Sequence, residues 1–187
     1  MTRRLTEIAH DLMARRVRDG DIVIDATMGN GHDTLFLAGL VGERGHVYAF
    51  DVQQQAIDRT GERLAAHGLS DRVTLIRESH ARMSGHLPQE ANGRIAAVVF
   101  NLGYLPGGEK HVTSAAQTTR KALEESLGLL GPGGIISVLV YVGHAGGQQE
   151  HRAVLEWLEG LPKAVRREHH NPDCAGHSPR LYTVARV

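Results

Sequence analysis

The sequence lacks a second cysteine, an excess of charge of either sign and any long apolar run. Cys174 stands alone, so no disulfide can form within the chain, and we expect a reducing compartment, the cytoplasm. Lysine plus arginine number 21, as do aspartate plus glutamate, so net charge does not point to a polyanionic partner. No apolar run is long enough to span a bilayer, and the N-terminus mixes charged and apolar residues throughout, unlike a signal peptide.

The chain also lacks repeats, low-complexity tracts and linkers, so we expect a single domain over residues 1–187. What it does contain is an alternation of strand-like and helix-like segments. Strands are predicted at 21–27, 45–51, 72–77, 95–101, 135–142, 163–170 and 180–187. Helices are predicted at 5–20, 33–42, 54–68, 114–130 and 146–160, the fourth ending at the Gly-Pro-Gly-Gly of 131–134.

This alternation predicts an α/β fold with helices on both faces of a mainly parallel sheet. The last two strands have no helix between them, so they are expected to pair as an antiparallel hairpin. A seven-stranded, mainly parallel sheet with such a terminal hairpin is typical of the Rossmann-like class I methyltransferases.

A glycine loop follows the first predicted strand, in the stretch "DATMGNGHDT" over 25–34. Ligands in doubly wound sheets bind at the carboxyl ends of strands, and Gly29 and Gly31 would let the backbone approach a ligand closely. Asp51 ends the second strand, 20 residues after Gly31. A carboxylate at about that offset is placed to bind the hydroxyls of a ribose.

The loop favours a cationic ligand over a dinucleotide. A dinucleotide fingerprint has a third glycine where this chain has Thr34. Asp25 and Asp33 would repel a pyrophosphate but attract the positive end of S-adenosyl-L-methionine, while Asp51 holds its ribose. Two alternatives remain open: Asp33 as the N-cap of the following helix, and Asp25 as a buried, hydrogen-bonded turn residue.

The fourth predicted strand ends in "NLGYLPGGEK" over 101–110, a variant of the Asn-Pro-Pro-Tyr motif of amino-methylating enzymes. The Asn101 side-chain oxygen can accept hydrogens of an amine and so aim its lone pair at a methyl carbon. Tyr104 is placed to stack on a base, or else belongs to the core. An alkylamine must also lose a proton, and the sequence does not choose among four candidate bases, Lys110, His111, Tyr141 and His144.

Taken together, the stretches at 25–34 and 101–110 resemble those of the bacterial tRNA (5-aminomethyl-2-thiouridine) methyltransferases, earlier labelled rRNA methylases. The matching stretches are "DATMGNGHDT", "FDVQQQAI", "ESH", "FNLGYLPGGEK" and "YVGHAGG". The resemblance implies S-adenosyl-L-methionine as donor and the tRNA anticodon arm as partner. It also implies methylation of the 5-aminomethyl nitrogen of the wobble uridine, which gives 5-methylaminomethyl-(2-thio)uridine.

The resemblance also implies site residues. The residues that bind the donor would be Thr27, Gly29, Asn30, Gly31, Asp51, Gln53, Ser79, His80 and Asn101. Asp25 and Asp33, which we expect to attract the positive end of the donor, add to this set. Those at the nucleoside would be Tyr104, Gly107, Gly108, Lys110, Tyr141 and His144, with Asn101, Tyr104 and Lys110 as catalytic residues. The competing interpretation of His80 is a loop histidine that faces solvent.

The segment 169–179 departs from the family pattern. It contains zinc-ligand types in His169, His170, Cys174 and His177, but their spacing fits a structural zinc site poorly, so we predict a polar substrate loop without metal. Three functions remain open: a tRNA wobble-uridine methyltransferase, a methyltransferase of rRNA or a small amine, and a donor-binding module without turnover. The small chain offers little surface to an anticodon arm, which favours a homodimer.

Overall fold

The computed structural model describes residues 3–103, 115–174 and 176–187. Its strands are β1 (Ile22–Asp25), β2 (His46–Asp51), β3 (Val73–Arg77), β4 (Ile95–Leu102), β5 (Leu130–Val140), β6 (Val165–His169) and β7 (Arg180–Arg186). Its α-helices are α1 (Leu5–Ala14), α2 (His32–Val41), α3 (Gln54–Ala66), α4 (Ala116–Leu129) and α5 (Gly147–Glu159). Short 3-10 helices are η1 (Ser70–Arg72), η2 (His80–His86) and η3 (Gln89–Ala91).

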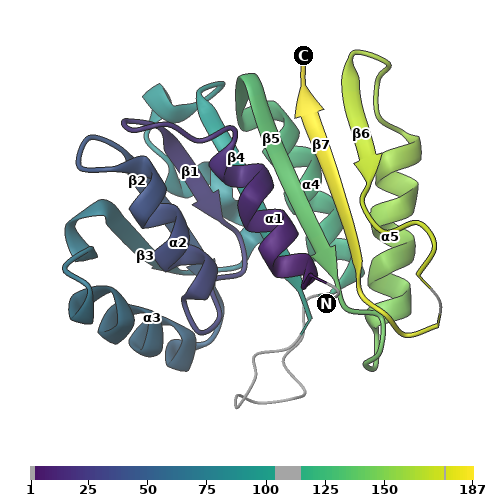
Figure 1. The fold of residues 1–187 in the computed structure, drawn as a ribbon, viewed down its shortest axis with the longest axis horizontal. Coiled ribbons are helices and arrows are strands. Elements are labelled where there is room, and N and C mark those ends of the chain that lie inside the picture. Colours follow the sequence, from purple (N-terminus) through teal and green to yellow (C-terminus); the bar gives the residue numbers. More distant parts are fainter. Residues whose placement is uncertain (1–2, 104–114, 175) are drawn as a thin grey trace.

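The strands form one seven-stranded sheet in the order β3-β2-β1-β4-β5-β7-β6 (Figure 1). β1 pairs in parallel with β2 and β4, β2 with β3, and β4 with β5. β7 runs antiparallel to both β5 and β6. The predicted fold class, including the terminal antiparallel hairpin, is therefore confirmed. The chain reverses its direction of strand addition between β1 and β4, and such a switch point is where open α/β sheets bind ligands.

The two largest apolar cores in the described part of the chain cover the two faces of the sheet. Val23 and Ile24 are neighbours in β1, yet they belong to different cores because successive strand side chains point to opposite faces. The core of Val23 includes Met13 of α1, and α1 lies across β5 in the front layer (Figure 1). The core of Ile24 includes Leu123 of α4 and Trp157 of α5. The structure therefore has helices on both faces, as predicted.

The fourth helix ends just before the Gly-Pro-Gly-Gly segment, as predicted, but this segment lies within a strand that begins earlier than the predicted residue 135. α4 ends at Leu129 and β5 begins at the next residue. A Cβ on Gly134 would lie 2.8 Å from the Ile95 carbonyl oxygen, so glycine allows β5 to pass close to β4 where their register shifts.

α1 is also shorter than predicted, since it ends at Ala14 rather than near Gly20. No helix in the described parts of the chain combines the length and apolar character that crossing a membrane requires.

Candidate active site

A cavity of about 480 Å³ opens at the carboxyl ends of β1, β2, β3 and β4, at the switch point of the sheet. Ten of the predicted site residues line it: Thr27, Gly29, Asn30, Asp33, Asp51, Gln53, Ser79, His80, Asn101 and Tyr141. The structure therefore brings together residues of the glycine loop after β1, of the ends of β2 and β4, and of the segment after β3.

The glycine loop is held between β2 and α3. The Gly29 N–H donates to Asp51 Oδ2 at 3.1 Å, and the Gly29 carbonyl accepts from the Thr60 hydroxyl at 3.2 Å. Gly31 does not line the cavity: it has φ of 76°, and a Cβ there would lie 2.8 Å from Thr60 Oγ1. The left-handed backbone of Gly31 and its close approach to α3 explain why this position is a glycine, and its predicted contact with the donor stays a prediction.

Asn30, the residue between these glycines, is fixed by two arginines of α3. Arg59 Nη1 donates to the Asn30 side-chain oxygen at 2.9 Å, and Arg63 Nε donates to its carbonyl oxygen at 2.8 Å. The tip of the loop thus keeps one shape at the mouth of the cavity. Such preorganisation lowers the entropic cost of binding a ligand.

Asp51 lies at the end of β2, as predicted, with its carboxylate held on both oxygens. Besides Gly29, the Gln53 N–H donates to Asp51 Oδ1 at 2.9 Å. Burial raises the pKa of Asp51, against the lowering effect of these backbone N–H groups. Each oxygen keeps a lone pair for a further donor, so the group suits a diol such as that of a ribose.

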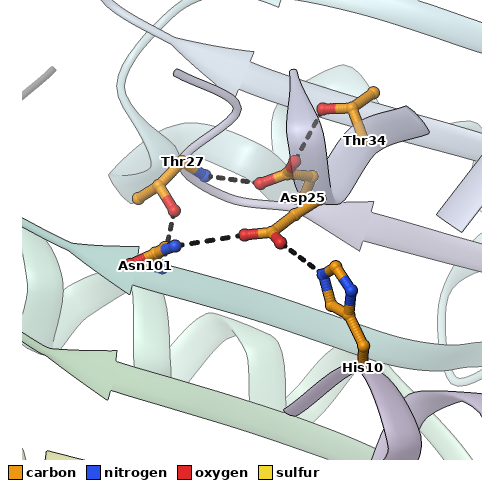
Figure 2. A network of polar contacts seen from close by, with 6 residues as sticks. His10, Asp25, Thr27, Thr34 and Asn101 are labelled. Atoms are coloured by element: carbon orange, nitrogen blue, oxygen red, sulfur yellow. Dashed lines mark hydrogen bonds and ion pairs between the residues drawn. The ribbon is translucent and has the colours of Figure 1, made fainter. Parts of the chain in front are cut away.

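Asp25 lies behind the cavity rather than in it. The residue is fully buried, does not line the cavity and accepts two hydrogen bonds. The donors are the Thr27 N–H at 3.1 Å and the Thr34 hydroxyl at 2.6 Å (Figure 2). The structure thus places Asp25 as the buried, hydrogen-bonded turn residue of the open alternative, away from the lining of the cavity. Burial and then the nearby Asp33 charge raise the pKa of Asp25 to about 7.

Asp33 bridges three parts of the chain. Its Oδ2 accepts from Asn101 Nδ2 at 3.2 Å, and its Oδ1 lies 2.6 Å from His10 Nε2. α2 has Gly31 at its N-cap and no side-chain cap, so the alternative of Asp33 as N-cap is wrong. The Asp33 carboxylate instead joins α1 and β4 at the edge of the cavity.

Asn101 is anchored through both its backbone and its side chain. Its N–H donates to Thr27 Oγ1 at 2.7 Å (Figure 2). Its amide nitrogen donates to Asp33 Oδ2. A carboxylate offers only acceptors, so the amide nitrogen is the end that faces Asp33. The amide is planar, so its oxygen then has a fixed direction and can accept hydrogen bonds from a ligand.

The segment after β3 contributes a buried histidine. His80 is 9% exposed, and its Nδ1 lies 3.1 Å from the Ala26 carbonyl, which can accept only if Nδ1 carries the proton. Burial lowers the pKa of His80 and favours the neutral ring. Its Nε2 is then an acceptor, and no other described residue donates to it. The alternative of a solvent-facing histidine is wrong. Neighbouring Ser79 caps η2 by accepting from the Ala81 N–H.

Tyr141 lines the cavity from the end of β5, close to Gly103, where a Cβ would lie 3.4 Å from Tyr141 Cδ2. Burial and the Asp33 charge raise the pKa of Tyr141, which keeps its phenol protonated. His144 does not line the cavity, and its Nδ1 lies 2.9 Å from the Ala145 carbonyl. Five predicted residues lie outside the described part of the chain: Tyr104, Gly107, Gly108, Lys110 and the candidate base His111.

Several cavity residues were not predicted from sequence. They include Met28, His32, Phe50, Val52, Glu78 and Thr118. Phe50 and Val52 flank Asp51, and Glu78 precedes Ser79. Their position next to a predicted site residue is therefore the sequence feature that could have identified them. Thr118 belongs to α4, and no spacing in the sequence places its side chain at the ends of the strands.

Two described histidines of the 169–179 segment, His169 and His170, take part in packing, whereas His177 is exposed. His169 stacks on Tyr182 with ring centroids 4.4 Å apart, and His170 Nε2 lies 2.8 Å from Thr183 Oγ1. Asn171 ties the segment together, because its amide donates to the Pro179 carbonyl and accepts from the Leu181 N–H. A substrate-binding role for this segment stays a prediction.

Comparison with known proteins identifies the family. Residues 47–177 match the family described as "Putative rRNA methylase". The chain belongs to this family. The resemblance found in the motifs is therefore confirmed, although the matched range begins after the glycine loop.

Three relatives of this rRNA methylase family member are informative. A chloroplastic "tRNA (mnm(5)s(2)U34)-methyltransferase" of Arabidopsis thaliana is 42% identical over 168 residues, which cover 86% of this chain but 61% of that protein. A "putative rRNA-methylase" of Clostridium thermocellum has a TM-score of 0.94 at 38% identity. A "putative methyltransferase" of Streptococcus mutans, solved in complex with SAH, has a TM-score of 0.87 at 34% identity. Both structures align over the full length of both chains. The cofactor prediction is thus confirmed at the level of the family.

Proposed function

We propose that this chain transfers a methyl group from S-adenosyl-L-methionine to the 5-aminomethyl nitrogen of a tRNA wobble uridine. The observation that carries the proposal is Asn101, which lies at the end of β4, lines the cavity and has its side-chain amide oriented by Asp33. The proposal is supported further by the Arabidopsis thaliana relative, whose name states this tRNA position.

The residues of the cavity suit the donor. Asp51 offers acceptors for the two ribose hydroxyls. Asp33, whose side chain is 15% exposed, adds negative charge beside Asn101, where a sulfonium or ammonium group would be stabilised. The bound donor supplies an electrophilic methyl carbon.

Asn101 would orient the acceptor amine. An amine has one lone pair, and methyl transfer requires that lone pair to lie in line with the carbon–sulfur bond. The Asn101 oxygen accepts one amine hydrogen and so restricts rotation of the amine, which raises the fraction of productive encounters. In this role Asn101 orients the amine and does not itself take up a proton.

The amine must be neutral when it attacks. Among the candidate bases, Tyr141 is disfavoured, because its raised pKa leaves the phenol as a donor at neutral pH. His144 does not line the cavity. Lys110 and His111 stay candidates that lie outside the described residues.

The proposed partner is the anticodon arm of tRNA, bound at the open mouth of the cavity. We propose that residues 1–187 act as one methyltransferase domain, since both apolar cores lie on the same sheet. The rRNA description of the family makes ribosomal RNA the competing substrate, and the experiment below separates the two.

The test offers methyl-labelled S-adenosyl-L-methionine and the full chain to four acceptors in separate reactions. These are tRNA with 5-aminomethyl at the wobble uridine, the same tRNA with plain uridine there, ribosomal RNA and small alkylamines. We expect label only in the first, recovered after nuclease digestion as 5-methylaminomethyl nucleoside by mass spectrometry. Label in ribosomal RNA or in the amines, and not in the tRNA, would show that the proposed tRNA substrate is wrong and that the labelled acceptor is the substrate. Donor binding without transfer to any acceptor would indicate a binding module.

A further inference from the structure

His10 is joined to the candidate active site although it belongs to α1, before the first strand. Its Nε2 lies 2.6 Å from Asp33 Oδ1. Its ring stacks on Phe36 of α2 with centroids 3.9 Å apart and an interplanar angle of 3°. The stacking fixes the plane of the imidazole, so the nitrogen that meets Asp33 is held in place from α2 (Figure 2 shows His10 at the edge of the network).

Asp33 transmits this restraint to Asn101. One oxygen of the carboxylate meets His10, and the other accepts from Asn101 Nδ2. A carboxylate is planar and rigid, so holding one oxygen in place restricts where the other oxygen can lie. Without His10, the Asp33 side chain regains rotation about two bonds, and the Asn101 amide loses a partner of defined position.

We propose that His10 is a positioning residue for methyl transfer, acting through Asp33 to hold the Asn101 amide in its productive orientation. The inference rests on the proposed function, because it takes Asn101 as the group that orients the acceptor amine. It makes α1 part of the active site, although the helix contributes no residue to the lining of the cavity. The matched family range of 47–177 does not include α1, so this contact comes from the structure alone.

Two substitutions separate the hydrogen bond from the packing. His10→Phe keeps an aromatic ring that can stack on Phe36 but removes the nitrogen that meets Asp33. His10→Gln loses the ring but offers an amide N–H at the same reach. His67→Phe is the matched control, since His67 lies at the end of α3, is exposed and bonds to the Arg63 carbonyl of its own helix.

The measurements are kcat on 5-aminomethyl tRNA, donor Kd by calorimetry, the thermal midpoint, and the Asn101 side-chain amide signal in a nitrogen-15 NMR spectrum. A misplacement of about 1 Å at a reacting group costs up to about 100-fold in rate, so we expect His10→Phe to lower kcat about tenfold. Donor Kd should stay within about twofold. The Asn101 amide signal should shift in His10→Phe, while His10→Gln recovers most of kcat and His67→Phe resembles the wild type.

Two results would overturn the inference. In one, His10→Phe is as fast as the wild type and the Asn101 signal does not move. In the other, His10→Phe and His10→Gln lose kcat, donor affinity and thermal midpoint together, as a purely structural role would require. Failure of the proposed function is a separate result: the wild type would then methylate no 5-aminomethyl tRNA. The Asn101 amide signal, measured without acceptor, would still decide whether His10 orients Asn101.

Discussion

Replacing Asp25 by asparagine tests whether this side chain supports the site from behind or contacts the ligand. The carboxyl group is fully buried and accepts from the Thr27 N–H and the Thr34 hydroxyl. An asparagine oxygen can accept from Thr27, and its amide can donate to the hydroxyl oxygen of Thr34. Both contacts are therefore kept while the charge is removed.

The magnitude follows from the pKa of Asp25. Burial, together with the Asp33 charge, raises that pKa from 3.8 to about 7. The folded state then binds more protons at Asp25 than the unfolded state does between these values, so the contribution of Asp25 to the free energy of unfolding is greatest below about pH 4 and falls as pH rises through 7. At about 1.4 kcal/mol for each pKa unit, ionising Asp25 costs on the order of 4 kcal/mol of stability.

The assay is urea denaturation of the wild type and Asp25→Asn between pH 4 and 8, with calorimetric titration of S-adenosyl-L-methionine at pH 8. We expect the variant to be more stable at pH 8, the difference to shrink toward pH 4, and donor Kd to change by less than about threefold. A donor Kd at least about tenfold weaker, with stability unchanged across the pH range, would refute the reasoning. It would return Asp25 to the ligand contact that the sequence predicted.

Three further substitutions test other parts of the site. Asn101→Ala should lower single-turnover methyl transfer about 100-fold and leave donor Kd nearly unchanged, because it removes the proposed orienting amide; equal losses in both would contradict that role. Asp51→Ala should weaken donor binding about tenfold by calorimetry, and unaltered affinity would remove the ribose assignment. Gly31→Ala should cost about 1–3 kcal/mol in urea denaturation, since its Cβ meets Thr60 at a positive φ. Gly68→Ala, with φ of 66° and open space, is its matched control, and an equal loss there would exclude the Thr60 contact as the cause.

Asp51 and Asn101 could be predicted from sequence because Asp51 ends β2 and Asn101 lies one residue before the end of β4, and the ends of parallel strands meet at one edge. The roles of Asp25 and Asp33 could not. Both flank the same loop, and only the path of that loop decides which carboxylate reaches the cavity. β1 ends at Asp25 and α2 begins at His32, so the chain folds back and covers Asp25 with Thr34.

His10 had no signal in the sequence that could connect it with the site. It lies on an amphipathic helix among apolar residues, where a histidine is usually part of a half-buried surface. Its contact with Asp33 joins residues 23 positions apart through the packing of α1 beside α2. Helix periodicity predicts which face of α1 is buried but not which neighbouring helix that face meets.

The two glycines of the loop show why a motif alone is an incomplete guide to a site. Gly29 lines the cavity, and its N–H holds Asp51 in place. Gly31 lies away from the cavity and is required by its close approach to Thr60 of α3. One glycine therefore shapes the ligand site, whereas the other fixes the loop to the scaffold. The stronger sequence signal for this chemistry is the pair of polar side chains that end β2 and β4, because each supplies acceptors that a methyl donor and an amine acceptor would need.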